Sequence, residues 1–268
     1  MFASENVVAA LVGGGAGLHA GIWGLYKDAP YEGFTWRQFI RSIVVAAILG
    51  PVLASWFGLP LDRASSIVLL FGLAYAAERA AVEVYKTFFR EQDQTKFTIP
   101  MQLAVFGKPV RNRFKRGLVG AGYLAVIGGG LAAIGWLESR LGPGPRWLVA
   151  LTVGASGGWF SAFGGAWKDA PIEGFQLAKF FRSPLISAGY AWVLLGLSSR
   201  WPIVVLGAIG YTVATIETYK TFGSAGKPPG KFANQPILFP GLMTRRASVI
   251  PIFVAIWVGL LSTFVLAT

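Results

Sequence analysis

Three residues of this sequence that could transfer protons or bind ions lie within or beside apolar stretches. His19 is the only histidine, and Glu78 and Arg79 directly follow the apolar run Ile67–Ala77. Ionisable residues are costly within an apolar membrane helix and are functional candidates by default, and histidine titrates near neutral pH. The alternative is structural: Glu78 and Arg79 form a neutral pair, and His19 makes a hydrogen bond between helices.

A further set of charged residues occurs twice. The segment Lys27–Phe34 (KDAPYEGF) returns as Lys168–Phe175 (KDAPIEGF). Likewise, Glu83–Phe88 (EVYKTF) returns as Glu217–Phe222 (ETYKTF). The charged candidates are Lys27, Asp28, Glu32, Arg41, Glu83 and Lys86, with their counterparts Lys168, Asp169, Glu173, Arg182, Glu217 and Lys220. We expect the charges of each copy to gather at one membrane face, either as an ion-pair clasp between helix ends or as a ligand site.

The two copies differ at the candidates inside the apolar stretches. Thr212 stands in the place of Glu78, and Phe160 stands in the place of His19. Duplication sets a shared scaffold and divergence changes one copy, so His19, Glu78 and Arg79 are expected to carry any activity. We expect Glu78 to face the protein interior, because a charge facing lipid at this depth costs at least about 2.5 kcal/mol.

Composition indicates the elements that must position these residues. The chain is 54% hydrophobic, has a mean hydropathy of +0.57 and carries only 13% charged residues, whereas soluble domains carry about 25%. Eight apolar runs reach about 20 residues when their flanks are included, the length of a spanning helix. They are Val7–Ile22, Ile43–Leu59, Ile67–Ala77, Leu118–Leu137, Leu148–Trp167, Leu185–Leu197, Ile203–Ile216 and Val249–Ala267. The sequence therefore predicts an all-α integral membrane protein with eight transmembrane helices.

The recurrence predicts a tandem repeat of four plus four helices. Residues 1–138 form the first repeat, residues 146–268 form the second, and the Gly- and Pro-containing segment 139–145 links them. Because four is an even number, both repeats insert in the same direction. We expect a parallel repeat with a pseudo-twofold axis along the membrane normal.

The basic residues predict the orientation. The net charge is +12, and 19 of the 24 Lys and Arg residues lie in the connections after the first, third, fifth and seventh expected helices, against four on the opposite side. This bias places those connections in the cytoplasm and both termini outside it. The N-terminus lacks a basic signal-peptide region, so the first helix is expected to remain. The pattern fits a bacterial-type plasma membrane and anionic lipids as partners, and it does not require nucleic acid.

The sequence lacks the residues that several common kinds of functional site require. There is no cysteine and only one histidine, so neither a transition-metal site nor a haem site is expected. Gly226 and Lys227 are followed by Pro228, which departs from the Walker phosphate-binding loop. No cofactor, metal or catalytic residue is predicted, and an enzyme is the less favoured interpretation.

Three functions remain open. The favoured one is a transporter or channel for an ion or a small polar solute, with an anion preferred, because both copies keep their charges. The second is a binding protein or enzyme for phospholipid or polyprenyl headgroups, in which Lys108–Arg116 holds phosphate and Asp28, Glu32 or Glu83 serves as a base or oxygen ligand. The third is a structural subunit of a larger membrane complex. A homo-oligomer is the alternative to a larger complex.

Overall fold

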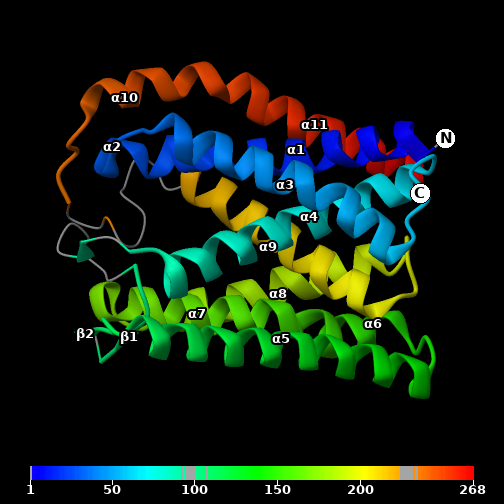
Figure 1. Ribbon diagram of the computed structural model, residues 1–268. Helices are drawn as coiled ribbons and strands as arrows, with labels where there is room; N and C mark the ends of the chain where they lie inside the picture. The colour runs from blue at the N-terminus through cyan, green and yellow to red at the C-terminus, as the bar shows by residue number, and fades with distance from the viewer. Residues whose placement is uncertain (1, 92, 95–100, 107, 224–231, 233–234) are drawn as a thin grey trace. The chain divides into compact units, whose positions relative to one another are not determined.

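The structure is a computed structural model that describes residues 2–91, 93–94, 101–106, 108–223, 232 and 235–268, mostly as long helices (Figure 1). Its first part contains α1 (Phe2–Lys27), the short α2 (Ala29–Glu32), α3 (Trp36–Phe57) and α4 (Ala64–Val84), which continues as a π-helical turn over Tyr85–Phe89. Two two-residue strands follow, β1 (Ala104–Val105) and β2 (Lys108–Pro109), and pair antiparallel with Ala104 opposite Pro109.

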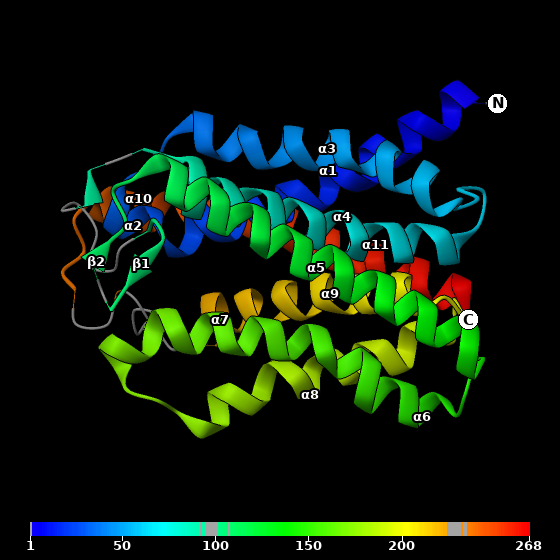
Figure 2. The same cartoon turned by 60° about the horizontal axis from the view of Figure 1, so that its bottom comes forward.

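The rest of the described chain is again helical. The elements are α5 (Arg113–Leu141), α6 (Arg146–Val149), a π-helical segment (Ala150–Gly154), α7 (Ala155–Glu173), α8 (Leu177–Leu194), α9 (Trp201–Phe222), α10 (Pro240–Arg245), a 3-10 turn (Arg246–Val249) and α11 (Ile250–Ala267). Figure 2 shows the same helices from another side.

Six helical segments of the described chain are long and apolar enough to cross a membrane. They are Ser4–Lys27, Trp36–Phe57, Arg113–Leu141, Arg146–Ala166, Trp201–Phe222 and Pro240–Ala267. The other two expected segments are the helices α4 and α8, but they are not among the six. α4 carries Glu78, Arg79 and Glu83, and α8 has Lys179 and Arg182 in its first turns. The chain thus has the helices of an all-α membrane protein, and the count of eight spans stays a prediction.

The described chain forms two compact units. The first comprises Met1–Glu78 and Gly144–Thr268, and the second comprises Arg79–Pro143. These units are defined by packing and differ from the expected repeats, which are defined by sequence recurrence, so the division into 1–138 and 146–268 remains a prediction.

In the first unit, α1 packs closely on α3 through small residues. A Cβ atom added to Gly17 would lie 2.3 Å from the Ser42 carbonyl oxygen, and one added to Gly13 would lie 2.1 Å from the Ala46 carbonyl oxygen. A side chain at either glycine would therefore force the two backbones apart. Such contacts are the usual reason for small residues at fourfold spacing in membrane helices.

The pair α7 and α8 is packed through the matching positions. A Cβ atom on Gly158 would lie 2.5 Å from the Ser183 carbonyl oxygen, and one on Gly154 would lie 2.3 Å from the Ala191 Cβ atom. In addition, the Ser187 hydroxyl donates a hydrogen bond of 2.8 Å to the Gly154 carbonyl oxygen. Gly158 and Ser183 follow Gly17 and Ser42 by the same 141 residues that separate the two Lys-Asp-Ala-Pro segments.

The core of the first unit lies where α4 crosses α9. A Cβ atom on Gly210 would lie 2.0 Å from the Gly72 carbonyl oxygen, so these two backbones also touch. The Tyr211 hydroxyl donates a hydrogen bond of 2.8 Å to the Val68 carbonyl oxygen. Around this crossing, buried apolar side chains from α1, α4, α8 and α9 form one cluster, which holds α1 in a fixed relation to α4 and α9.

Both Lys-Asp-Ala-Pro segments end at a glycine with a positive φ. The φ angles are +84° at Gly33 and +75° at Gly174, where a side chain would be strained. Each glycine therefore lets the chain leave one helix and turn into the next. Asp28 holds the N-cap position of α2 but makes no capping hydrogen bond with its side chain.

Candidate functional site

An ion pair joins the end of α1 to α9. The Lys27 ammonium donates a hydrogen bond of 2.6 Å to Glu217 Oε2. Only 10% of the Lys27 side chain and 12% of the Glu217 side chain are exposed. Lys27 is the last residue of α1, where the partial negative charge of the helix end favours a cation. The sequence predicts that the charges gather within each copy, whereas this pair joins a residue of the first copy to one of the second.

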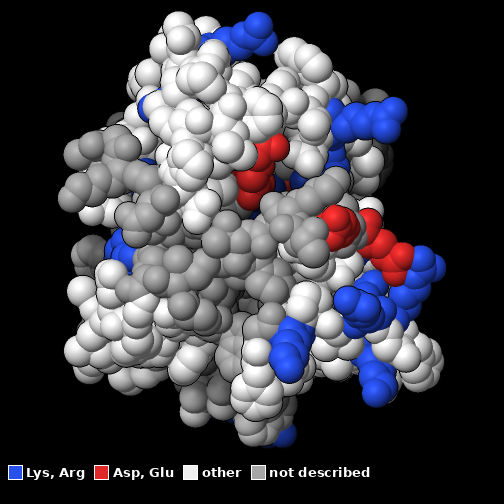
Figure 3. Space-filling view, turned by 90° about the vertical axis from the view of Figure 1, so that its left-hand side faces the viewer, with Lys and Arg blue, Asp and Glu red and all other residues white. Residues whose placement is uncertain are grey.

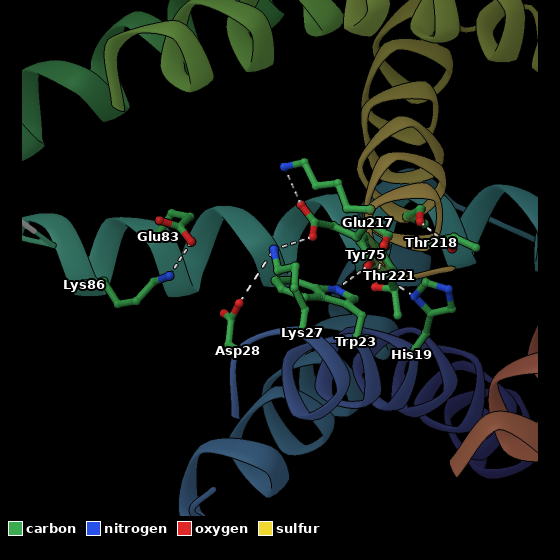
Figure 4. Close-up of polar contacts among 12 residues, drawn as sticks. His19, Trp23, Lys27, Asp28, Tyr75, Glu83, Lys86, Glu217, Thr218 and Thr221 are labelled. Carbon is green, nitrogen blue, oxygen red and sulfur yellow. Dashed lines mark hydrogen bonds and ion pairs between the residues drawn. The ribbon is translucent and has the colours of Figure 1, made fainter. Parts of the chain in front are cut away.

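Two more charged residues of the described chain lie beside this pair. Lys220 lies one turn after Glu217 on α9, and its ammonium is 3.3 Å from Glu217 Oε1. Asp28 Oδ1 lies 3.8 Å from the Lys27 ammonium. Figure 4 shows Lys27 between Asp28 and Glu217. These four described residues carry two positive and two negative charges.

A second group of polar side chains lies deeper along α1. Tyr75 of α4 is the shared partner, since its hydroxyl oxygen lies 3.2 Å from His19 Nδ1 and accepts a hydrogen bond of 2.9 Å from Trp23 Nε1. His19 is fully buried, and Tyr75 is 1% exposed. Figure 4 shows His19 and Trp23 of α1 with Tyr75 beside them.

The α1 residues of both groups lie on one side of the helix. His19, Trp23 and Lys27 follow one another at intervals of four, so they occupy one helix face. The Lys27 ammonium lies 4.4 Å from the centre of the Trp23 ring, within the range of a cation–π contact. Trp23 thus contacts both the deep group and the ion-pair cluster.

Aromatic rings of α11 close the deep group. The Phe253 ring stacks on His19 with centroids 4.2 Å apart, and the Trp257 ring meets His19 edge-on at 5.4 Å. The Trp257 indole donates a hydrogen bond of 3.3 Å to Thr218 of α9. Residues from α1, α4 and α9, together with Asp28 just after α1, form one connected set that α11 closes from one side. We call this set the α1–α9 seam: His19, Trp23, Lys27, Asp28, Tyr75, Glu217 and Lys220.

Glu78 and Arg79, the charged candidates on α4, follow the seam residue Tyr75 by three and four positions. Glu78 is fully buried, in agreement with the expectation that it avoids lipid. Arg79 follows it and is partly buried. Thr212, the counterpart of Glu78, is also fully buried, and its hydroxyl donates a hydrogen bond of 2.6 Å to the Ala208 carbonyl oxygen.

The remaining predicted residues are placed as follows. Glu83 and Lys86 pair with each other in the second unit. Arg182 lies in the first turns of α8, with its guanidinium carbon 5.7 Å from the centre of the Tyr219 ring. Glu32 is the last residue of α2, and Arg41 is a partly buried residue of α3. The side chains of Lys168, Asp169 and Glu173 lie outside the described part of the structure.

Residues that precede α10 contact the first Lys-Asp-Ala-Pro segment. The backbone amides of Leu238 and Phe239 both donate hydrogen bonds to the Pro30 carbonyl oxygen, at 3.0 and 2.9 Å. The Tyr31 ring stacks on the Phe232 ring with centroids 4.4 Å apart. Phe232, Leu238 and Phe239 of the second copy therefore contact α2 of the first copy.

A separate ion-pair group in the second unit uses residues of the basic loop. Glu91 pairs with Arg113 and, at 3.2 Å, with Arg116. The hydrogen bond from Arg113 lowers the pKa of the Glu91 carboxyl; desolvation opposes it, and the positive charges of Arg113 and Arg116 add to it. Arg116 is buried and also donates hydrogen bonds to the carbonyl oxygens of Phe88 and Val110. These two arginines therefore have structural partners.

Sequence reasoning missed Trp23 and Tyr75, because neither is charged or repeated. The available signal was the interval of four that places Trp23 between His19 and Lys27. In the described residues, histidines and acids form no group that could hold a metal ion. Both signs of charge appear on the face shown in Figure 3.

Comparisons of the chain with protein-family models, with curated proteins and with solved structures found no match.

Proposed function

We propose that this protein is a membrane transporter or channel for an ion or small polar solute, and that α1 and α9 must separate at the Lys27–Glu217 end for the solute to pass. The observation that carries the proposal is the largely buried pair between these two helices. A buried ion pair stabilises a fold no better than apolar residues of similar volume. As a contact that can be made and broken between helices, however, it suits a gate.

The proposed solute is anionic. The four described residues Lys27, Asp28, Glu217 and Lys220 carry two charges of each sign, so the preference for an anion does not rest on them. The preference rests on the basic excess, which raises the local concentration of anions at the face that carries it. A carboxylate or phosphate group of a solute would compete with Glu217 for Lys27 and so would open the pair.

We further infer the tandem repeat of eight helices, with both termini outside the cytoplasm and the membrane of bacterial plasma-membrane type. The repeat is supported by the matching contacts of Gly17 with Ser42 and of Gly158 with Ser183. The orientation is supported by the uneven distribution of basic residues. Anionic lipids are the partners that this orientation implies.

The headgroup-binding alternative has less support, since Arg113 and Arg116 of its phosphate loop are paired with Glu91. The structural-subunit alternative would be favoured if no solute crosses the membrane. The test is therefore flux into proteoliposomes. We would load them with a pH-sensitive and a voltage-sensitive dye and offer inorganic anions, small carboxylates and monovalent cations in turn.

The expected result is solute-dependent flux above that of protein-free liposomes. Glu217→Gln should change this flux at least several-fold, because it weakens the contact between α1 and α9. Asp62→Asn is the matched control, since Asp62 is an exposed acid between α3 and α4, and it should leave the flux unchanged. Absence of flux for every solute offered would overturn the proposal.

A further inference from the structure

The β1–β2 hairpin is fixed to the start of α5 by a buried arginine, Arg116, which is 2% exposed. Its guanidinium donates hydrogen bonds of 3.0 and 3.1 Å to the carbonyl oxygens of Val110 and Arg111, and one of 3.2 Å to that of Phe88. The Val110 amide in turn donates a hydrogen bond of 2.8 Å to the Leu103 carbonyl oxygen, across the base of the hairpin. Within the second unit, the hairpin is therefore held at the end where α5 begins (Figure 1).

The hairpin exposes an aromatic side chain at its turn. Val105 pairs with Lys108, so Phe106 lies between the two strands. Its φ is +48°, a left-handed conformation that is unfavourable for a bulky residue, and the residue is 93% exposed. Phe114, the second residue of α5, is 79% exposed. A strained backbone at an exposed ring is a reason to infer a partner for that ring.

Exposed basic side chains lie at the same end of α5. They belong to Lys108, Arg111 and Lys115, and among the described residues no acid pairs with any of the three. The N-terminal end of a helix carries a partial positive charge that disfavours cations. In addition, the segment 90–116 contains seven Lys and Arg residues but only two acidic residues. This end of the second unit therefore attracts anions.

The length of α5 indicates the depth at which these residues lie. Residues 117–137 contain no charged side chain and fall within the candidate span Arg113–Leu141. These 21 residues extend about 31 Å as a helix, which matches a hydrocarbon core of about 30 Å. When they span the core, Arg116 lies at its boundary, and the hairpin that Arg116 holds lies at the level of the headgroups.

We propose that this end of the second unit binds anionic phospholipid headgroups through a hairpin surface formed by Phe106, Lys108, Arg111, Phe114 and Lys115. The three basic side chains contact lipid phosphates, and the two rings enter the boundary between headgroups and acyl chains. The inference deepens the lipid partnership inferred above. It rests on α5 spanning a membrane and not on solute transport. A soluble anion would satisfy the basic side chains but would leave both rings in water.

A spin label on the hairpin tests the proposal. The chain has no cysteine, so a nitroxide attached at Phe106→Cys reports this position alone. We would place the labelled protein in nanodiscs of phosphatidylcholine, with or without phosphatidylglycerol. Power saturation measures how accessible the label is to oxygen, which concentrates in the bilayer, and to a water-soluble nickel chelate. Phosphatidylglycerol should raise the accessibility to oxygen and lower that to nickel.

The triple variant Lys108→Gln, Arg111→Gln, Lys115→Gln should abolish this shift and give the values found in phosphatidylcholine alone. The matched control removes three exposed basic residues elsewhere and should keep the shift: Arg37→Gln, Arg63→Gln, Arg245→Gln. The double variant Lys108→Arg, Lys115→Arg retains the charge and should also keep it. A shift that survives in the first triple variant, or a label equally open to nickel in both nanodiscs, would overturn the lipid site.

Inorganic phosphate distinguishes a headgroup from a soluble anion. Added to the phosphatidylcholine nanodiscs, it should leave the label unchanged, and a shift equal to that caused by phosphatidylglycerol would overturn the lipid assignment. A label that becomes immobile only in native membranes would identify a protein as the occupant and would overturn it as well. No solute is used, so a failed flux screen leaves the lipid site standing, and a failed lipid test leaves the transport proposal standing.

Discussion

The Lys27 ammonium and the Glu217 carboxylate lie 2.6 Å apart although 190 residues separate them in the sequence. The pair brings together residues of the two recurring segments, one at the end of α1 and one within α9. Because little of either side chain is exposed, the two charges depend on each other and on Lys220.

Replacing Lys27 with Met should lower the free energy of unfolding by about 2–3 kcal/mol. Removing one partner of a buried pair costs about 3–5 kcal/mol, and Lys220 compensates part of the charge that remains on Glu217. Denaturation of the purified protein in detergent measures the effect. The double variant Lys27→Met, Glu217→Gln should regain more than half of the loss, and a double variant less stable than Lys27→Met would contradict this account.

Glu217→Gln should lower the melting temperature more than Glu83→Gln, although both change the same position of the recurring motif. From the sequence we would expect both to be destabilising. However, 47% of the Glu83 side chain is exposed, so its pair with Lys86 contributes at most about 1 kcal/mol, whereas Glu217 lies in a buried cluster. Melting temperatures of the two variants in the same detergent decide the matter. Equal losses would show that burial does not distinguish the two acids.

Gly17→Ala should destabilise the α1–α3 pair by about 1–3 kcal/mol, because the new methyl group would meet the Ser42 carbonyl oxygen. The control is Gly15→Ala on the same helix. A Cβ atom at Gly15 meets nothing within 4 Å, so this change should be neutral or stabilising by up to about 1 kcal/mol. Thermal unfolding of both variants is the measurement, and a neutral Gly17→Ala would contradict the close packing.

Low pH should weaken the ion pairs that Glu91 makes with Arg113 and Arg116. Because the pKa of Glu91 is lowered in the folded protein, its contribution to stability is fully present above the ordinary glutamate pKa of about 4.3 and is lost as the pH falls through the lowered folded value. Hydrogen exchange of residues 108–116, corrected for the intrinsic effect of pH, should show less protection at pH 3 than at pH 6. Glu91→Gln should remove that difference, and a variant with the same acid response as wild type would refute the assignment.

The sequence predicted the helices well because each is marked by an apolar run, and the six helices that qualify as spans fall on expected runs. It also placed Lys27 and Glu217 at helix ends. It did not predict that these two residues meet, because recurrence suggests contacts within a copy, as Glu83 makes with Lys86. Which copy supplies a partner is decided by tertiary packing, here by the crossing of α4 and α9 at Gly72 and Gly210.

The deep part of the seam was only half predictable. His19 could be identified because an ionisable residue inside an apolar helix needs a partner. The partner itself, Tyr75, is neutral and lies in an apolar run, where an aromatic residue commonly serves only as packing. The sequence contains no signal that separates a packing tyrosine from one that bonds histidine, so this contact required the structure.

The separation of α1 and α9 can be tested most directly by crosslinking. The Tyr26 and Phe222 rings lie 4.9 Å apart beside the Lys27–Glu217 pair, and the chain has no cysteine of its own. The double variant Tyr26→Cys, Phe222→Cys can therefore be joined by a short bis-methanethiosulfonate reagent and released by reduction. We predict that crosslinking stops solute flux in proteoliposomes, that reduction restores it, and that the single variants are unaffected. Undiminished flux through the fully crosslinked protein would contradict the account.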